Sequence, residues 1–126
     1  MVKLQTILIV DDDQQVLHIL AEALERMGKC FEIVSASDGR EARCKAKEIK
    51  VDLLITDLNL PEMDGISLTR YLRKINSVLP VIWITAYANR NIQKEAESMA
   101  ISQVIEKPFE IAYIRGKARA LLDCAP

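Results

Sequence analysis

Residues 7–13 have the sequence ILIVDDD, in which four apolar residues lead directly into three aspartates. Two later segments repeat this order: LLIT at residues 53–56 precedes Asp57, and VIE at residues 104–106 precedes Lys107. Short apolar runs rich in β-branched residues predict buried strands of a parallel sheet. In an open α/β sheet, functional side chains gather outside the carboxyl ends of such strands. The three segments therefore predict one acidic pocket with a lysine beside it.

The rest of the chain alternates between strand-like and helix-like patterns. The expected strands are residues 7–10, 31–36, 51–56, 81–84 and 103–105. The expected helices are residues 14–27, a segment capped by Ser37 or Asp38 with Glu41 placed for a capping box, and residues 66–75, 91–99 and 110–122. Five strands alternating with five helices predict parallel βαβ units with right-handed crossovers. The expected fold class is α/β, a doubly wound five-stranded parallel sheet with helices on both faces.

The composition fits one domain, and we expect residues 1–126 to form it. The chain is 50% hydrophobic and 28% charged, which supports a core and argues against disorder. Seventeen basic residues stand against eighteen acidic ones, for a formal net charge of -1. Because no basic excess exists to neutralise a phosphate backbone, we do not expect direct binding to nucleic acid.

The chain shows no targeting signal and no membrane-spanning pattern. Residues 1–6 lack the apolar core of a signal peptide, and no apolar stretch is long enough to span a bilayer. Cys30, Cys44 and Cys124 are odd in number and lack CxxC spacing, which favours reduced thiols over a disulfide framework or a zinc site. We therefore expect a cytoplasmic protein without membrane insertion.

The aspartates suggest a metal site. Asp11, Asp12 and Asp57 are expected to meet at adjacent strand ends, where like charges destabilise one another unless a cation intervenes. Oxygen ligands suit a hard divalent ion, and we expect Mg²⁺, while the absence of His or Cys near these positions argues against zinc. The alternative is that the aspartates are a helix cap and solvated charges, and Asp13 is expected to be such a cap.

Asp57 is the expected nucleophile of this pocket. A lysine, a threonine hydroxyl and Mg²⁺ around one carboxylate would neutralise the oxygens of a phosphoryl group, and aspartate is a nucleophile in such chemistry. Asp57 stands alone at a strand end, before a loop punctuated by Pro61 and by Asp64-Gly65. The alternative is that Lys107 forms only a buried salt bridge.

Four blocks of the chain resemble the signature blocks of one family. They are ILIVDDD (residues 7–13), LLITDLNLPEMDG (residues 53–65), VIWITAYA (residues 81–88) and VIEKPF (residues 104–109). In this order and spacing they resemble the receiver domain of bacterial two-component response regulators, over about residues 5–122. The resemblance implies a flavodoxin-like (βα)5 fold with strand order 2-1-3-4-5.

The resemblance also implies a role for each residue of the pocket. Asp57 would be the phosphoacceptor and a Mg²⁺ ligand, Asp12 would bind Mg²⁺ directly, and Asp11 would act mainly through water. Asn59 would offer its backbone carbonyl to the ion.

Two further residues would act on the phosphoryl group by the same resemblance. Thr85 would hydrogen-bond it and couple phosphorylation to a loop shift, while Lys107 would ion-pair with its oxygens, with a cis peptide bond before Pro108. The phosphoryl group would come from a sensor histidine kinase, a phosphotransfer protein or a small phosphodonor. The chain would then be a signalling domain that assists its own phosphorylation and dephosphorylation, rather than an enzyme, and would act on a downstream partner.

The chain departs from the family pattern in three places. Val104 replaces an aromatic residue that usually lies three positions before the lysine, so we expect intact phosphorylation chemistry and altered coupling to output. Ala100-Ile101 replaces a frequent Gly-Ala, which suggests a different backbone path, with a modest energetic cost if φ must be positive. Tyr87 could shield an acylphosphate, or could be a surface residue on a mobile loop.

Two other functions remain open from the sequence. A degenerate receiver could act only as an interaction scaffold, although retention of the five polar site residues argues against it. A small Mg²⁺-dependent phosphatase would share the aspartate and the ion. Such enzymes typically place a general-acid aspartate two residues after the nucleophile, where this chain has Asn59.

Overall fold

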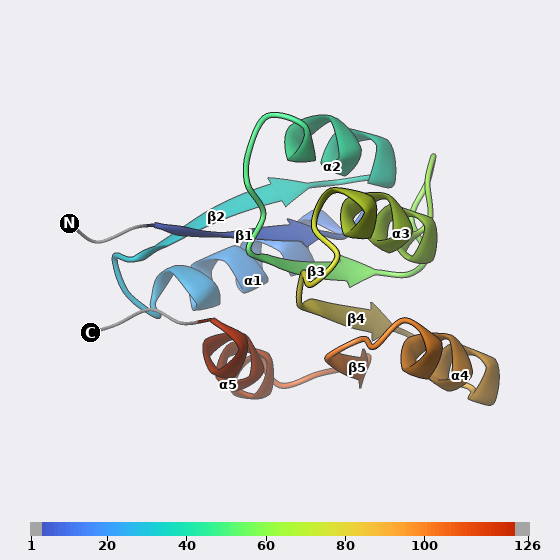
Figure 1. Ribbon diagram of the computed structural model, residues 1–126. Coiled ribbons are helices and arrows are strands. Elements are labelled where there is room, and N and C mark those ends of the chain that lie inside the picture. The colour runs from blue at the N-terminus through green and yellow to red at the C-terminus, as the bar shows by residue number, and fades with distance from the viewer. Residues whose placement is uncertain (1–3, 123–126) are drawn as a thin grey trace.

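Five parallel strands form one sheet in the order β2-β1-β3-β4-β5, in a computed structural model that describes residues 4–122. The strands are β1 (Gln5–Val10), β2 (Phe31–Ala36), β3 (Leu53–Asp57), β4 (Val81–Thr85) and β5 (Gln103–Glu106). The helices are α1 (Gln14–Glu25), α2 (Gly39–Ala46), α3 (Gly65–Ile75), α4 (Arg90–Ser98) and α5 (Ile111–Leu121). Figure 1 shows the alternation of strand and helix along the chain. The predicted fold class and strand order are confirmed.

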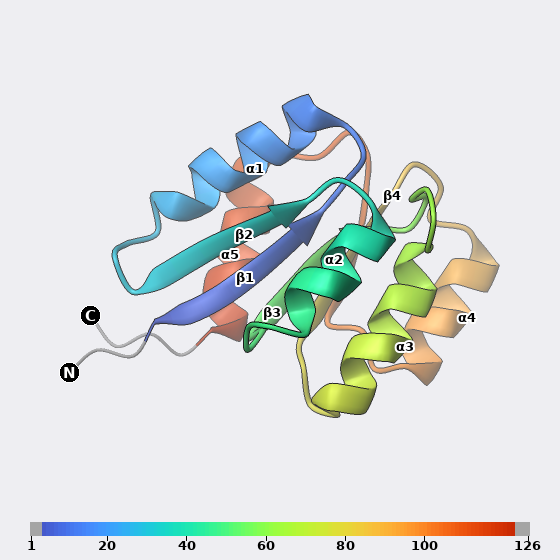
Figure 2. The ribbon, with the colours of Figure 1, turned by 90° about the horizontal axis from the view of Figure 1, so that it is seen from above.

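Helices cover both faces of the sheet. Figure 2 shows α1 and α5 on one face and α2, α3 and α4 on the other. Alternate residues of β1 divide between the two layers: Ile7 and Ile9 belong to the core under α1 and α5, while Leu8 and Val10 belong to the core under α2 and α3. Because β1 is buried on both faces, its sequence is a continuous apolar run rather than an alternating one.

The element boundaries differ from the expected ones by one or two residues. Asp57 is the last residue of β3 rather than the first residue after it, and Thr85 likewise ends β4. Helix α1 ends at Glu25 rather than at Met27, and Gly28, with φ 137°, follows the end of the helix. Such differences are ordinary at element ends, where the hydrogen-bond ladder frays.

Side-chain caps begin four of the helices. Asp13 accepts hydrogen bonds from the Gln15 and Val16 amides, which confirms it as the cap of α1. Asp38, rather than Ser37, caps α2 through the Glu41 amide. The Glu41 carboxylate returns to the Ser37 amide at 2.7 Å, one residue before the position that a capping box contacts. Helices α3 and α4 begin with equivalent caps, made by Asp64 and Asn89.

The expectation of three reduced cysteines is wrong for Cys30, which is disulfide-bonded, whereas Cys44 is free and exposed. Cys124 lies outside the described residues. Cysteine pairing depends on tertiary proximity, which the spacing of cysteines along a chain does not reveal.

Within residues 4–122, no helix combines the length and the apolar character that a bilayer span requires.

Candidate functional site

The carboxyl ends of β1 and β3 bring three aspartates together. These strands are neighbours, with Val10 paired to Thr56, so the residues that follow them emerge side by side. One carboxylate oxygen from each of Asp11, Asp12 and Asp57 lies within 4.8 Å of the others. Asp11 and Asp57 are buried, and Asp12 is exposed. The predicted acidic pocket is confirmed.

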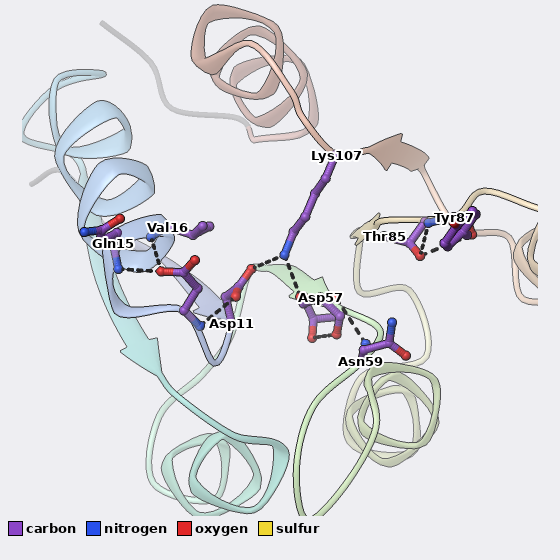
Figure 3. A network of polar contacts seen from close by, with 10 residues as sticks. Asp11, Gln15, Val16, Asp57, Asn59, Thr85, Tyr87 and Lys107 are labelled. Atoms are coloured by element: carbon purple, nitrogen blue, oxygen red, sulfur yellow. Dashed lines mark hydrogen bonds and ion pairs between the residues drawn. The ribbon is translucent and has the colours of Figure 1, made fainter.

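Lys107 reaches this pocket from the end of β5. Its Nζ lies 2.7 Å from Asp57 Oδ2 and 3.1 Å from Asp11 Oδ2, and Figure 3 shows the side chain extending toward both acids. The Lys107 amide donates to the Thr85 carbonyl at 2.8 Å, which fixes the backbone from which the side chain starts. The peptide bond to Pro108 is cis, as the sequence resemblance implied.

Burial and charge act against each other in this cluster. Burial raises the pKa of Asp11, and the Asp13 amide and Lys107 only partly offset that rise. Burial lowers the pKa of Lys107, but its contacts with Asp57 and Asp11 outweigh burial, so the net pKa is raised. Lys107 is therefore held in its charged form beside the two buried acids.

Asp11 also has an incompletely satisfied oxygen. Asp11 Oδ1 accepts a hydrogen bond from the Asp13 amide at 2.9 Å. Asp11 Oδ2 is buried and accepts no hydrogen bond from the part of the chain that the structure describes, although it faces the Lys107 charge. A buried carboxylate oxygen without a hydrogen-bond donor is costly unless another cation or a water contacts it.

The loop after β3 is held closely against Asp57. The Asn59 amide donates to Asp57 Oδ1 at 3.1 Å, and the Gly65 amide donates to the Leu58 carbonyl at 3.0 Å. A Cβ at Gly65 would overlap the Asp57 carbonyl oxygen, and a Cβ at Gly39 would overlap the Met63 carbonyl. Glycine is therefore required at both positions by close approach of the backbone.

Thr85 lies at the same edge of the sheet but is engaged elsewhere. It is only 4% exposed, and its hydroxyl lies 3.2 Å from both the carbonyl oxygen and the amide nitrogen of Tyr87 (Figure 3). The Tyr87 side chain is 77% exposed, which favours the surface-residue alternative over a shield for the pocket. Among the described residues, Asp11, Asp57 and Lys107 thus form one contact network, and the Thr85 hydroxyl contacts the loop after β4.

A buried hydrogen-bond chain supports the pocket from behind, and the sequence did not reveal it. Trp83 Nε1 donates to Thr69 Oγ1 at 2.9 Å, and the Thr69 hydroxyl donates to the Gly65 carbonyl at 2.7 Å. All three residues are buried. The available signal was the Trp83 indole, because a tryptophan inside a core strand needs an acceptor for its N–H.

Comparison with known proteins places this geometry in a family. A family model described as the response regulator receiver domain matches residues 7–119. The alkaline phosphatase synthesis transcriptional regulatory protein PhoP of Bacillus subtilis is 32% identical over 116 residues, covering 92% of this chain and 48% of PhoP. The response regulator receiver protein CpdR of Brucella abortus is 29% identical over 122 residues, covering 97% of this chain and 100% of CpdR.

A solved structure has the same fold. A chain of the CheX-CheY-BeF3-Mg+2 complex from Borrelia burgdorferi superposes with a TM-score of 0.83 at 27% identity, covering 93% of this chain and 88% of that one. The present chain spans about half the length of PhoP and of other curated relatives. Because the family model covers most of the chain and PhoP is 32% identical over 92% of it, the chain belongs to the response regulator receiver domains of bacterial two-component systems.

Proposed function

We propose that residues 1–126 form a single receiver domain that accepts a phosphoryl group on Asp57 with the help of Mg²⁺. The observation that carries this proposal is the convergence of three carboxylates and the Lys107 ammonium at one edge of the sheet. Phosphoryl transfer needs positioning and charge neutralisation more than covalent help from the protein, and this cluster supplies both.

The residues of the pocket fit a magnesium ion. The three carboxylates offer only oxygen ligands, and the buried Asp11 Oδ2, which faces Lys107 Nζ, accepts no hydrogen bond from the described residues. Asp12 would bind the ion directly, Asp57 and the Asn59 carbonyl would complete the protein ligands, and Asp11 would act mainly through water. When bound, Mg²⁺ would neutralise charge on the acids and on phosphoryl oxygens.

In the proposed reaction, a carboxylate oxygen of Asp57 attacks the phosphorus of the donor. The bond between phosphorus and the donor's leaving atom breaks, the leaving group keeps the electron pair, and an acylphosphate forms on Asp57. Lys107 already contacts Asp57 Oδ2, so its charge lies where phosphoryl oxygens would be. Thr85 would turn its hydroxyl from Tyr87 toward the phosphoryl group.

A sensor histidine kinase or a phosphotransfer protein is the proposed donor, and a small phosphodonor could replace it. The Borrelia complex pairs a similar chain with CheX, beryllofluoride and Mg²⁺, which supports phosphoryl chemistry and partner binding as properties of such domains. We propose that this domain likewise acts in the cytoplasm on a downstream protein. Asn59, rather than a general-acid aspartate, continues to argue against a phosphatase.

The test is to incubate the protein with Mg²⁺ and acetyl phosphate and to measure the intact mass. Wild type is expected to gain one phosphoryl group, Asp57→Ala none, and Glu62→Gln, a control at an exposed carboxylate of the same loop, as much as wild type. The absence of any Mg²⁺-dependent adduct on wild type would overturn the proposed function. Rapid turnover of many phosphoesters would instead favour the phosphatase.

A further inference from the structure

The loop between Thr85 and α4 is attached to the rest of the domain by few polar contacts. The Thr85 hydroxyl contacts the Tyr87 backbone, and Asn89 caps α4. Between them, the Ala88 amide donates to Glu106 Oε2 at 3.0 Å. Of the polar contacts that the structure gives for residues 86–88, the one with Glu106 alone attaches the loop to β5.

The position of Glu106 is set by the sheet rather than by the loop. Glu106 is the register partner of Thr85 in the β4–β5 pairing, and the amide of the next residue, Lys107, donates to the Thr85 carbonyl. Two consecutive residues at the end of β5, Glu106 and Lys107, thus contact both the loop after β4 and the acidic pocket. Lys107 contacts the acids, and the Glu106 carboxylate contacts the loop that follows Thr85.

The packing around Val104 leaves no aromatic side chain of β4 or β5 that could move, which makes the contact made by Glu106 more important. Val104 pairs with Trp83 and packs against the core under α3 and α4. The Trp83 ring is fully buried and its N–H is bonded to Thr69, so this layer already holds a fixed aromatic side chain. Val104 has no ring that could exchange between buried and exposed positions. Glu106 lies two residues further along the same strand and therefore on the same face of the sheet.

We propose that Glu106 is a positioning residue, whose carboxylate holds the loop after β4 in the arrangement that keeps the Thr85 hydroxyl on the Tyr87 backbone. This inference rests on the proposed function, since it assumes that Thr85 turns toward a phosphoryl group on Asp57. In this proposal the hydroxyl leaves Tyr87 as it turns, and the adjoining Ala88 moves with the loop relative to β5. The bond from Ala88 to Glu106 opposes that movement, so Glu106 biases the domain toward its unphosphorylated arrangement.

Two variants separate the hydrogen bond from the charge. Glu106→Ala removes the acceptor, whereas Glu106→Gln removes the charge but keeps a carbonyl oxygen that can accept from Ala88. The control is Glu110→Ala, because Glu110 is an exposed carboxylate near the same strand end that makes no capping hydrogen bond. Glu106 is itself exposed, so none of these changes is expected to disturb folding.

The first measurement is hydrogen exchange of the Ala88 amide in the protein without phosphodonor. Exchange in Glu106→Ala is expected to be roughly twofold to tenfold faster than in wild type. This range corresponds to the net free energy that one hydrogen bond contributes. Glu106→Gln and Glu110→Ala are expected to remain close to wild type. An unchanged Ala88 amide in Glu106→Ala would overturn the proposal.

The second measurement is binding of beryllofluoride with Mg²⁺, a probe that stands in for the phosphoryl group. If Glu106 opposes the loop movement, Glu106→Ala should bind the probe more tightly by roughly the same factor, because such coupling is reciprocal. Weaker or unchanged binding, or equal effects of Ala and Gln, would overturn the role of the hydrogen bond. Absence of binding in wild type would instead remove the proposed function, and this inference with it.

Discussion

The two halves of the site differ in how firmly they are held. At the ends of β1 and β3, Asp11 and Asp57 are buried, contact Lys107, and lie against backbone that tolerates no Cβ at Gly65. At the ends of β4 and β5, the loop that begins after Thr85 is mostly exposed and is held by a few single hydrogen bonds. Burial, ion pairs and close backbone approach hold the first half in one arrangement. Only a few hydrogen bonds hold the second half.

This difference matches the two tasks proposed for this domain. The proposed chemistry needs charges at fixed positions, because electrostatic stabilisation is strongest where groups need not reorganise. A change of state needs an element with two arrangements of similar free energy, which few contacts permit. The predictions below test how firmly particular positions are held, each against a matched position elsewhere, from the largest expected effect to the smallest.

Gly65→Ala should be the most damaging change. The new methyl group would overlap the Asp57 carbonyl, so the backbone must shift, at a cost of about 3 kcal/mol in the free energy of unfolding. Gly116→Ala in α5, where a Cβ would meet nothing within 4 Å, should instead stabilise by up to about 1 kcal/mol. Urea unfolding of both variants checks this, and similar values for the two would show that the first half is not tightly packed.

Lys107→Met should have the second-largest effect on stability. It leaves Asp11 and Asp57 facing each other without a cation, and we expect a loss of about 2 kcal/mol, somewhat below the range for a fully buried pair. Added Mg²⁺ should recover part of that loss in a thermal unfolding experiment, because the ion would replace the missing charge. Lys94→Met, at an exposed lysine of α4, is the control. Equal stability of the two variants would mean that the ion pairs contribute nothing.

Thr69 is bonded to Gly65 behind the first half and Thr85 lies in the second half, so the same substitution at both positions sharpens the comparison. Thr69→Val leaves the buried Trp83 N–H without its acceptor and should cost about 2 kcal/mol. Thr85→Val removes only the contacts with the Tyr87 backbone and should cost about 1 kcal/mol or less, while increasing amide exchange at Tyr87. Chemical denaturation and hydrogen exchange measure both. A larger loss for Thr85→Val would reverse the assignment of the rigid half.

Ala100→Gly should have a small effect, and a favourable one. Ala100 has φ 51°, the condition under which we expected a cost for the absent glycine. Glycine there should raise the free energy of unfolding by about 1 kcal/mol. The Arg73 guanidinium donates to the Met99 and Ala100 carbonyls and so supports the turn that contains Ala100. Partial burial lowers the pKa of Arg73. Ala42→Gly, inside α2, should destabilise, and a matching loss for Ala100→Gly would show that φ is not strained.

Much of the pocket could be predicted from local sequence, but not all. Asp11, Asp57 and Lys107 follow apolar runs, and the carboxyl ends of parallel strands necessarily share one edge of the sheet. Glu106, Thr69 and Gly39 carried no such signal, and Gly65 was recognised only as part of a turn. Glu106 precedes the lysine without any pattern that pairs it with residue 88, and Thr69 is one polar residue within a helix. Their roles depend on contacts between segments distant in the sequence.

The sequence by itself determined the order of strands and helices, the class of fold, the cap of α1 and the gathering of the acids, because each follows from local periodicity or from strand direction. The tertiary structure alone decided which oxygens Lys107 contacts, that Trp83 bonds through Thr69 to Gly65, that Cys30 is disulfide-bonded, and that Glu106 meets Ala88. These pairings arise from strand register and side-chain packing, which place distant residues within a few ångströms and which no local pattern encodes.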